Sequence, residues 1–359
     1  MCMRRLLLSF IVLVSFGVGA YSSPPDSLSW LQRTVRGFSK IDTSYVEPQH
    51  YNFAAMVQLT HTYDIYQLKS SNGQSITLAP SPRMKVGPYF GWRWIFAGYT
   101  IDLHNLGGST TSKQEWDLSI YAAQIGVDLF YRRTGNDYKI RDINLGKEVP
   151  SELSDPIEGM EFDGLSVGIT GFNIYYIFNH QRFSYPAAFA QSTCQKISCG
   201  SWLAGIGYIH NSLEFDHEKL QRMVEVYSTI PSAEIDSGLM FNSVKYYDYS
   251  LTGGYAYNWV FARNWLFCAS ASLGLGYKRV IGDADAERQR GFRFSNINFD
   301  GVARLGLVYN NTKWYGGASA VFHGYTYRKP RFSANNAFGS LNIYVGFNFG
   351  ERSAYKEKK

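Results

Sequence analysis

The sequence predicts an all-β protein: an antiparallel transmembrane β-barrel of about twelve strands (range about ten to fourteen), with a short N-terminal amphipathic helix. Three observations support this class. Only 18% of the 359 residues are charged, whereas 16% are aromatic; in an average soluble domain about a quarter are charged. Beyond residue 20 no apolar stretch approaches the roughly 20 residues that a membrane-spanning helix needs. The C-terminal half alternates between apolar and small or polar residues, which is typical of strands.

Residues 1–22 have the layout of a secretory signal peptide. Arg4 and Arg5 precede an apolar run over 6–20 that ends in small residues. The alternative, a membrane anchor, requires a longer apolar run. We therefore expect a cleaved signal peptide and export to the outer membrane of a Gram-negative bacterium.

The mature chain is expected to form one barrel domain with short flanking segments. Residues 23–50 form a periplasmic segment, in which apolar residues at helical spacing predict a helix over 27–39. The barrel itself occupies 51–350, and residues 351–359 are a charged C-terminal tail. A second helical pattern lies within 213–244.

Twelve strands follow from the alternation and from the turn residues between them. They lie near 51–69, 74–81, 83–92, 93–104, 114–132, 164–178, 201–212, 246–260, 265–279, 293–309, 313–328 and 337–350. The even number predicts that both ends of the barrel lie on the periplasmic side. With this count, the turn at 91–93 is external and the one at 105–113 is periplasmic. Within 114–132 the alternation changes phase, which a bulge or a hidden turn explains.

The strand over 265–279 shows why a membrane barrel is preferred to a soluble sandwich. Trp265 and Tyr277 flank an aliphatic stretch on one face, and the opposite face carries small and polar residues. Two membrane interfaces select aromatics at both ends of an apolar face. A secreted β-sandwich that binds a ligand remains an alternative, because a sandwich buries one apolar face of each sheet in its core.

Two charged or titratable residues are expected to face the lumen. Arg304 and His323 alternate with the lipid-facing positions of two neighbouring strands. Such residues tune selectivity in an open pore, and in a plugged barrel they pair with other groups. The sequence leaves both alternatives open.

The segment 179–200 is a candidate plug or docking element. It is long for a periplasmic connection and contains Arg182, Phe183, Tyr185 and Lys196. A rim loop that packs on the N-terminal helix is the alternative. Cys194 and Cys199 are a candidate disulfide in an oxidising compartment, and two free thiols are equally compatible with their spacing.

The sequence predicts no cofactor and no metal site. It favours a non-enzymatic role over an enzymatic one. The G-x-S-x-G pattern at 164–168 lies in a continuous strand pattern, whereas a nucleophile elbow needs a strand, a turn and a helix. A barrel enzyme that modifies lipids or lipopolysaccharide is the alternative function, and it requires a Ser-His or His-Asp pair within hydrogen-bond reach on one face. The expected partners are outer-membrane lipids and a periplasmic protein. The mild positive charge does not support nucleic-acid binding.

Three stretches resemble a known family. They are Ile41 to Pro48, the segment from Arg182 to Phe189 with its continuation to Lys196 and Ser201, and Gly254 to Asn258. They are similar to the domain-of-unknown-function family 4421, and the similarity extends over about 40–350. It implies an outer-membrane barrel of the Bacteroidota type, with no assigned activity and no catalytic residues to transfer.

Overall fold

The computed structural model describes residues 41–92, 95–98, 101–102, 114–134, 137–146, 155–227, 234–282, 296–328 and 332–356. The strands of its main wall are β2 (Tyr51–Ser70), β4 (Arg83–Trp92), β5 (Ile95–Gly98), β6 (Ile101–Asp102), β7 (Gln114–Tyr121), β8 (Ile125–Arg133), β11 (Leu165–Ile177), β13 (Cys199–Phe215), β14 (Ser243–Ala262), β15 (Trp265–Gly282), β16 (Ile297–Asn310), β17 (Trp314–Arg328) and β18 (Phe332–Glu351). The other elements are β1 (Val46–Pro48), β3 (Ser75–Pro80), β9 (Tyr138–Asn144), η3 (Asp155–Ile157), β10 (Glu161–Phe162), α3 (Tyr185–Phe189), β12 (Thr193–Gln195) and α4 (His217–Tyr227).

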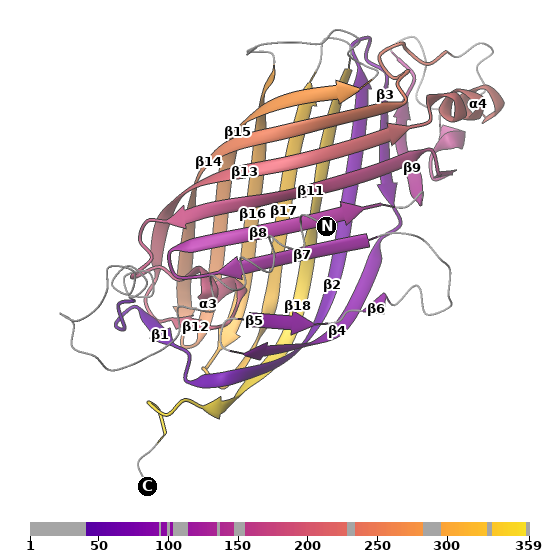
Figure 1. Ribbon diagram of the computed structural model, residues 1–359. Coiled ribbons are helices and arrows are strands. Elements are labelled where there is room, and N and C mark those ends of the chain that lie inside the picture. Colours follow the sequence, from indigo (N-terminus) through magenta and orange to yellow (C-terminus); the bar gives the residue numbers. More distant parts are fainter. Residues whose placement is uncertain are drawn as a thin grey trace, which may run out of the picture.

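The wall of the barrel is one tilted antiparallel sheet (Figure 1). Its strand order is β4, β2, β18, β17, β16, β15, β14, β13, β11, β8, β7, and β5 and β6 both pair with β4. If β5 and β6 are counted as two pieces of one strand, this wall has twelve strands within the described residues. The predicted fold class and approximate strand number are therefore confirmed.

The outer face of the wall is apolar. Leu251, Leu273 and Phe299 are each more than two thirds exposed, at 71%, 75% and 71%. Large apolar side chains with this exposure are unfavourable in water but match a hydrocarbon environment. A β-sandwich would bury these side chains between two sheets, so the sandwich alternative is wrong.

Both ends of the barrel sequence lie at the same edge of the wall. Tyr51 at the start of β2 is paired with Glu351 at the end of β18. The connections at this edge are short between β7 and β8, β14 and β15, and β16 and β17, and short turns are typical of the periplasmic side. Trp92 pairs with Phe53 at this edge, so the expected external turn at 91–93 is on the periplasmic side. Residues 105–113 lie outside the described residues.

Two of the predicted wall strands differ in the structure. The strand expected at 74–81 is present as β3, but it pairs with the outer end of β2 (66–69) and with β9 instead of standing between β2 and β4, because β4 pairs with β2 over 53–62. Because β2 has 20 residues, it is long enough for two successive partners. The strand expected over 114–132 is two strands, β7 and β8, and the hidden turn at 122–124 explains the change of phase.

The external end carries a compact cap made of β3, β9, β10, η3, α4 and residues 234–241 (Figure 1). Its buried side chains, among them Tyr138, Phe162, Leu220 and Phe241, form one cluster with the external ends of the wall strands. The cap is also joined by polar contacts, since Asn72 donates to Asp236 at 2.5 Å. The helical pattern expected within 213–244 is α4.

The expected signal peptide over 1–22 and the helix over 27–39 lie outside the described residues. Within the described part of the chain, each helix is too short or too polar to cross a membrane.

Candidate functional site: the plugged lumen

The segment between β11 and β13 folds back into the periplasmic mouth of the barrel. It contains α3 and β12, and β12 pairs with β1 to form a small two-stranded sheet. Ser184 caps α3 by accepting a hydrogen bond from the Ala187 backbone nitrogen, and Pro186 lies in the first turn, where its missing N–H costs nothing. We call residues 179–198 the plug.

Gln195 is the centre of the plug. Its side-chain amide donates to the carbonyl oxygens of Arg182 at 2.6 Å and Ile197 at 3.0 Å. Its Oε1 atom accepts hydrogen bonds from the Ser184 backbone at 2.9 Å and from Asn258 of β14 at 3.0 Å. Gln195 is 6% exposed, and losing such buried hydrogen bonds is costly, so these bonds fix the shape of the segment.

The plug is bonded to three further wall strands. The Tyr185 hydroxyl lies 2.5 Å from Ser270 Oγ of β15. Gln191 donates to the Tyr344 hydroxyl of β18 at 2.7 Å, and Asn310 of β16 donates to the Gln191 carbonyl at 3.3 Å. Together with the Asn258 bond, these contacts attach the plug to one continuous part of the wall, between β14 and β18.

The four plug residues expected from the sequence divide into two pairs. Phe183 and Tyr185 are fully buried in the lumen among wall aromatics such as Tyr175. Arg182 and Lys196 lie at the periplasmic surface, where Arg182 pairs with Asp42 at 3.6 Å and lies over the Tyr45 ring.

Arg304 faces the lumen and forms an ion pair with Asp128 of β8. β16 and β8 are not neighbours in the sheet, so this pair crosses the barrel. Ser119 also donates to Asp128, at 2.7 Å, and the Arg304 guanidinium lies 5.2 Å from the centre of the Tyr175 ring. Arg304 is 3% exposed and Asp128 is 6% exposed. Charged side chains that line a water-filled channel would be in contact with water, whereas this pair is buried.

His323 also faces the lumen, but it is part of an aromatic cluster. Its ring stacks on Phe338 with centroids 4.9 Å apart and contacts Phe130 at 6.0 Å. The Tyr325 hydroxyl lies 3.4 Å from its Nδ1 atom. In register, Arg304 is opposite Val321 and His323 is opposite Val302, so the two residues are diagonal neighbours.

A buried triad of charges was missed by the sequence reasoning. Lys278 Nζ lies 3.0 Å from Asp300 and 3.4 Å from Asp248, and it donates to the Thr326 carbonyl at 2.6 Å. The three charged residues belong to β15, β16 and β14 and are at most 5% exposed. Asp300 is in phase with Arg304, so the alternation that identified Arg304 contained the signal for it.

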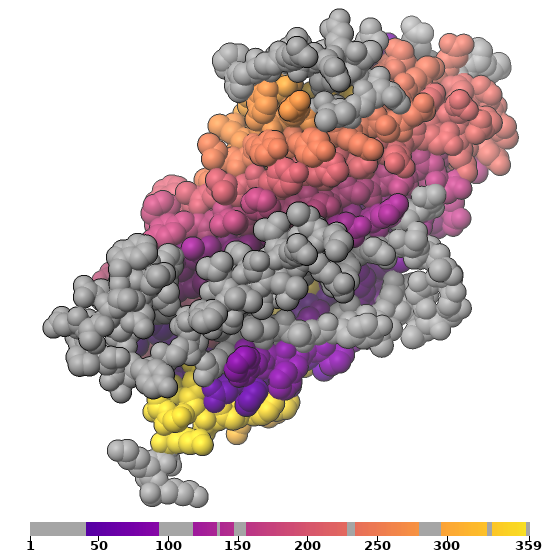
Figure 2. All heavy atoms as spheres, viewed as in Figure 1, coloured from indigo at the N-terminus to yellow at the C-terminus, as the bar shows by residue number. Residues whose placement is uncertain are grey.

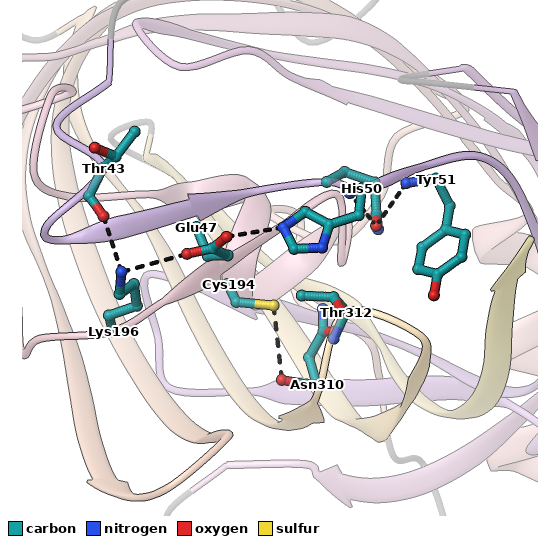
Figure 3. Close-up of polar contacts among 9 residues, drawn as sticks. Thr43, Glu47, His50, Tyr51, Cys194, Lys196, Asn310 and Thr312 are labelled. Atoms are coloured by element: carbon teal, nitrogen blue, oxygen red, sulfur yellow. Dashed lines mark hydrogen bonds and ion pairs between the residues drawn. The ribbon is translucent and has the colours of Figure 1, made fainter. Parts of the chain in front are cut away.

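Polar residues join β1 to β12 outside the lumen (Figure 3). Glu47 accepts from Lys196 at 3.3 Å and pairs with His50 at 2.8 Å, while Lys196 also donates to the Thr43 carbonyl at 3.0 Å. Burial of Glu47 opposes its ionisation, but the hydrogen bonds from His50 and Lys196 outweigh burial and lower the pKa of the carboxyl group.

In the structure Cys194 and Cys199 are both free thiols. Their sulfur atoms have different neighbours, because Cys194 Sγ donates to the Asn310 carbonyl at 3.6 Å and Cys199 Sγ lies 3.2 Å from the Asn179 side chain. Burial raises the pKa of the Cys194 thiol to about 12. A thiol of this kind is a poor nucleophile at neutral pH.

The described residues do not show the Ser-His form of the pair that the enzyme alternative requires. Ser166 of the G-x-S-x-G pattern lies within β11, and no hydrogen bond in this part of the chain joins a serine to a histidine. Among the same residues, no group of three His, Cys, Asp or Glu side chains could hold a metal ion.

The family model described as "Domain of unknown function (DUF4421)" matches residues 40–349. No curated protein matches the sequence. Among solved structures, the chain is similar to the outer membrane protease OmpT from Escherichia coli, with 8% identity, 86% of this chain and 100% of that chain covered, and a TM-score of 0.36. It is also similar to the translocator domain of the autotransporter NalP from Neisseria meningitidis, with 9% identity, coverage of 89% and 93%, and a TM-score of 0.32. For the outer membrane protein OprG from Pseudomonas aeruginosa the identity is 10%, the coverage 84% and 98%, and the TM-score 0.23. No residue role transfers at these identities.

Proposed function

The chain belongs to the DUF4421 family, and from this starting point we propose that it is an outer-membrane barrel with a structural role, closed to passive diffusion. One observation carries the proposal: within the described residues, the lumen holds the plug and is crossed by the Arg304–Asp128 pair. A passive pore needs a continuous water path, and buried side chains and ion pairs occupy this path here.

A transport-like role is the second candidate, and the chemistry of the plug attachment supports it. Besides the packing of Phe183 and Tyr185 among wall aromatics, the plug is held by hydrogen bonds from Tyr185, Gln191 and Gln195, and each bond contributes only about 0.5–1.5 kcal/mol. A plug held in this way can be displaced by a partner that offers alternative contacts. The periplasmic protein predicted from the sequence would act at Arg182 and Lys196, which are exposed.

Conductance of the purified barrel in a planar bilayer tests the closed state. We expect no steady current from the wild type. A variant in which residues 183–192 are replaced by a Gly-Ser linker should conduct, because it lacks α3 and the Tyr185 and Gln191 contacts. Arg182→Gln is the matched control, because it changes the exposed rim of the same segment and should remain closed.

Conductance is compared only between proteins that show the heat-dependent electrophoretic shift of a folded barrel. Steady wild-type current would refute closure. A folded linker variant that stays closed would show that the plug is not the closing element. Opening of the wild type only after a periplasmic extract is added would favour the transport-like role.

A further inference from the structure

The apolar band on the outer face has a defined external boundary. On β15 it extends from Trp265 to Tyr277, with exposed leucines between them. Twelve steps of about 3.3 Å, tilted by roughly 40°, correspond to about 30 Å along the membrane normal. This is close to the thickness of the hydrocarbon core, so the head groups of the outer leaflet begin just beyond Tyr277.

A row of aromatic side chains marks this boundary on four adjacent strands. Phe172, Tyr208, Tyr249 and Tyr277 are register partners in that order. The ring centroids of Phe172 and Tyr208 are 5.8 Å apart, and those of Tyr208 and Tyr249 are 5.3 Å apart. Such a row is typical of a membrane interface, and the outer face of these strands forms the magenta-to-orange bands in Figure 2.

Three exposed cations lie directly beyond the aromatic row. Arg279 is paired in register with Tyr247, Lys245 lies one residue pair further out, and Arg133 of β8 lies in the same row as Lys245. We call Arg133, Lys245 and Arg279 the cationic patch. Lys245 and Arg279 are diagonal neighbours at about 7–8 Å, and Arg133 is three strand spacings from Lys245, about 14 Å.

Within the described part of the chain, the cationic patch has no partner. None of its three residues forms an ion pair or a hydrogen bond through its side chain among the described residues. Gly168 and Ser212 separate Arg133 from Lys245 in the row, so no bulky side chain stands between them. On the outward positions of these strands, the one acidic residue in the described range near the patch is Glu214.

We propose that Arg133, Lys245 and Arg279 bind the phosphate groups of an anionic glycolipid in the outer leaflet. Guanidinium and ammonium groups are the usual ligands of phosphate, and basic clusters at the membrane surface recruit anionic head groups. The stacked rings of His210 and Tyr247, 4.6 Å apart, lie beside the patch and provide a flat surface for a sugar. The inference rests on the proposed outer-membrane location and orientation.

The test measures lipopolysaccharide retained by the purified, detergent-solubilised barrel. The probes are intact lipopolysaccharide, the same material after enzymatic dephosphorylation, and phosphatidylglycerol vesicles. The variant is Lys245→Gln/Arg279→Gln. Its matched control is Arg263→Gln/Lys313→Gln, which removes two exposed charges at the periplasmic turns. All proteins must show the same heat-dependent electrophoretic shift.

We expect the patch variant to bind intact lipopolysaccharide about tenfold more weakly, equivalent to about 1.4 kcal/mol, and the control variant to bind like the wild type. Wild-type binding should also fall to the variant level after dephosphorylation. Equal binding by variant and wild type, or equal loss in the control, overturns the proposal. Stronger binding to phosphatidylglycerol than to lipopolysaccharide would assign the patch to a phospholipid instead. Because none of these readouts depends on conductance, a failure here is distinct from a failure of the closed-barrel proposal.

Discussion

Replacing Arg304 by methionine is expected to destabilise the barrel strongly. The substitution preserves most of the side-chain volume but leaves Asp128, which is 6% exposed, without its cation. Removing one member of a buried ion pair typically costs about 3–5 kcal/mol. Ser119 still donates to Asp128, which offsets part of the loss. The contact with Tyr175 is also lost. We therefore expect a decrease of about 3 kcal/mol in the free energy of unfolding.

The assay is urea unfolding of the barrel in lipid vesicles, followed by tryptophan fluorescence and by the heat-dependent electrophoretic shift. The double variant Arg304→Met/Asp128→Asn should recover at least half of the loss, because it leaves no unpaired charge in the lumen. Arg263→Met is the control at an exposed turn position, where substitutions change stability by about 0.5 kcal/mol or less. A loss below about 1 kcal/mol in Arg304→Met, or a double variant as unstable as the single one, would refute the reasoning.

Three further predictions concern other contacts. Lys278→Met leaves Asp248 and Asp300 buried without a cation, so urea unfolding should show a loss of at least about 3 kcal/mol, which neutralising both aspartates reverses. Cys194, whose thiol pKa is raised to about 12 by burial, should resist maleimide at pH 7.5 in the folded barrel and react after denaturation, and the non-reduced protein should show no disulfide-dependent mobility shift. Glu47 has a lowered pKa in the folded state, so its pairs stabilise the protein above the ordinary carboxyl value and this contribution disappears as the pH falls through the folded pKa. The free energies of unfolding of the wild type and of Glu47→Gln, obtained from thermal melting, should therefore differ by under about 1 kcal/mol at pH 6. This difference should disappear in acid.

The wall strands of the C-terminal half could be predicted from the sequence, because each has a lipid face and a lumen face that differ in chemistry. Trp265 and Tyr277 bound such a face on β15. The N-terminal half was harder because β2 extends beyond the membrane and pairs there with β3. The cap buries nearly every residue of 75–80. The alternation of residue types in this strand therefore does not distinguish a lipid face from a lumen face.

The candidate site was only partly predictable for a different reason. Alternation assigns Arg304 to the lumen, but its partner Asp128 lies on a strand that is not adjacent in the sheet. Which opposite strand is reached depends on barrel diameter and on strand tilt, and neither is encoded locally. The composition of the plug indicated a special role, whereas its hydrogen bonds to Ser270 and Tyr344 depend on strands far away in the sequence.

The cations on the two faces of the wall differ in whether the protein supplies them with a carboxylate partner. In the lumen, Arg304 and Lys278 each have a carboxylate partner from another strand, because a buried charge without a partner is costly. On the outer face, Lys245 and Arg279 have no partner among the described residues, although they lie at the edge of an apolar band. A partner supplied by the protein is therefore needed only where the protein is the sole environment. In the orientation that we propose, the outer environment includes the lipid head groups, whose negative charge would meet these unpaired cations.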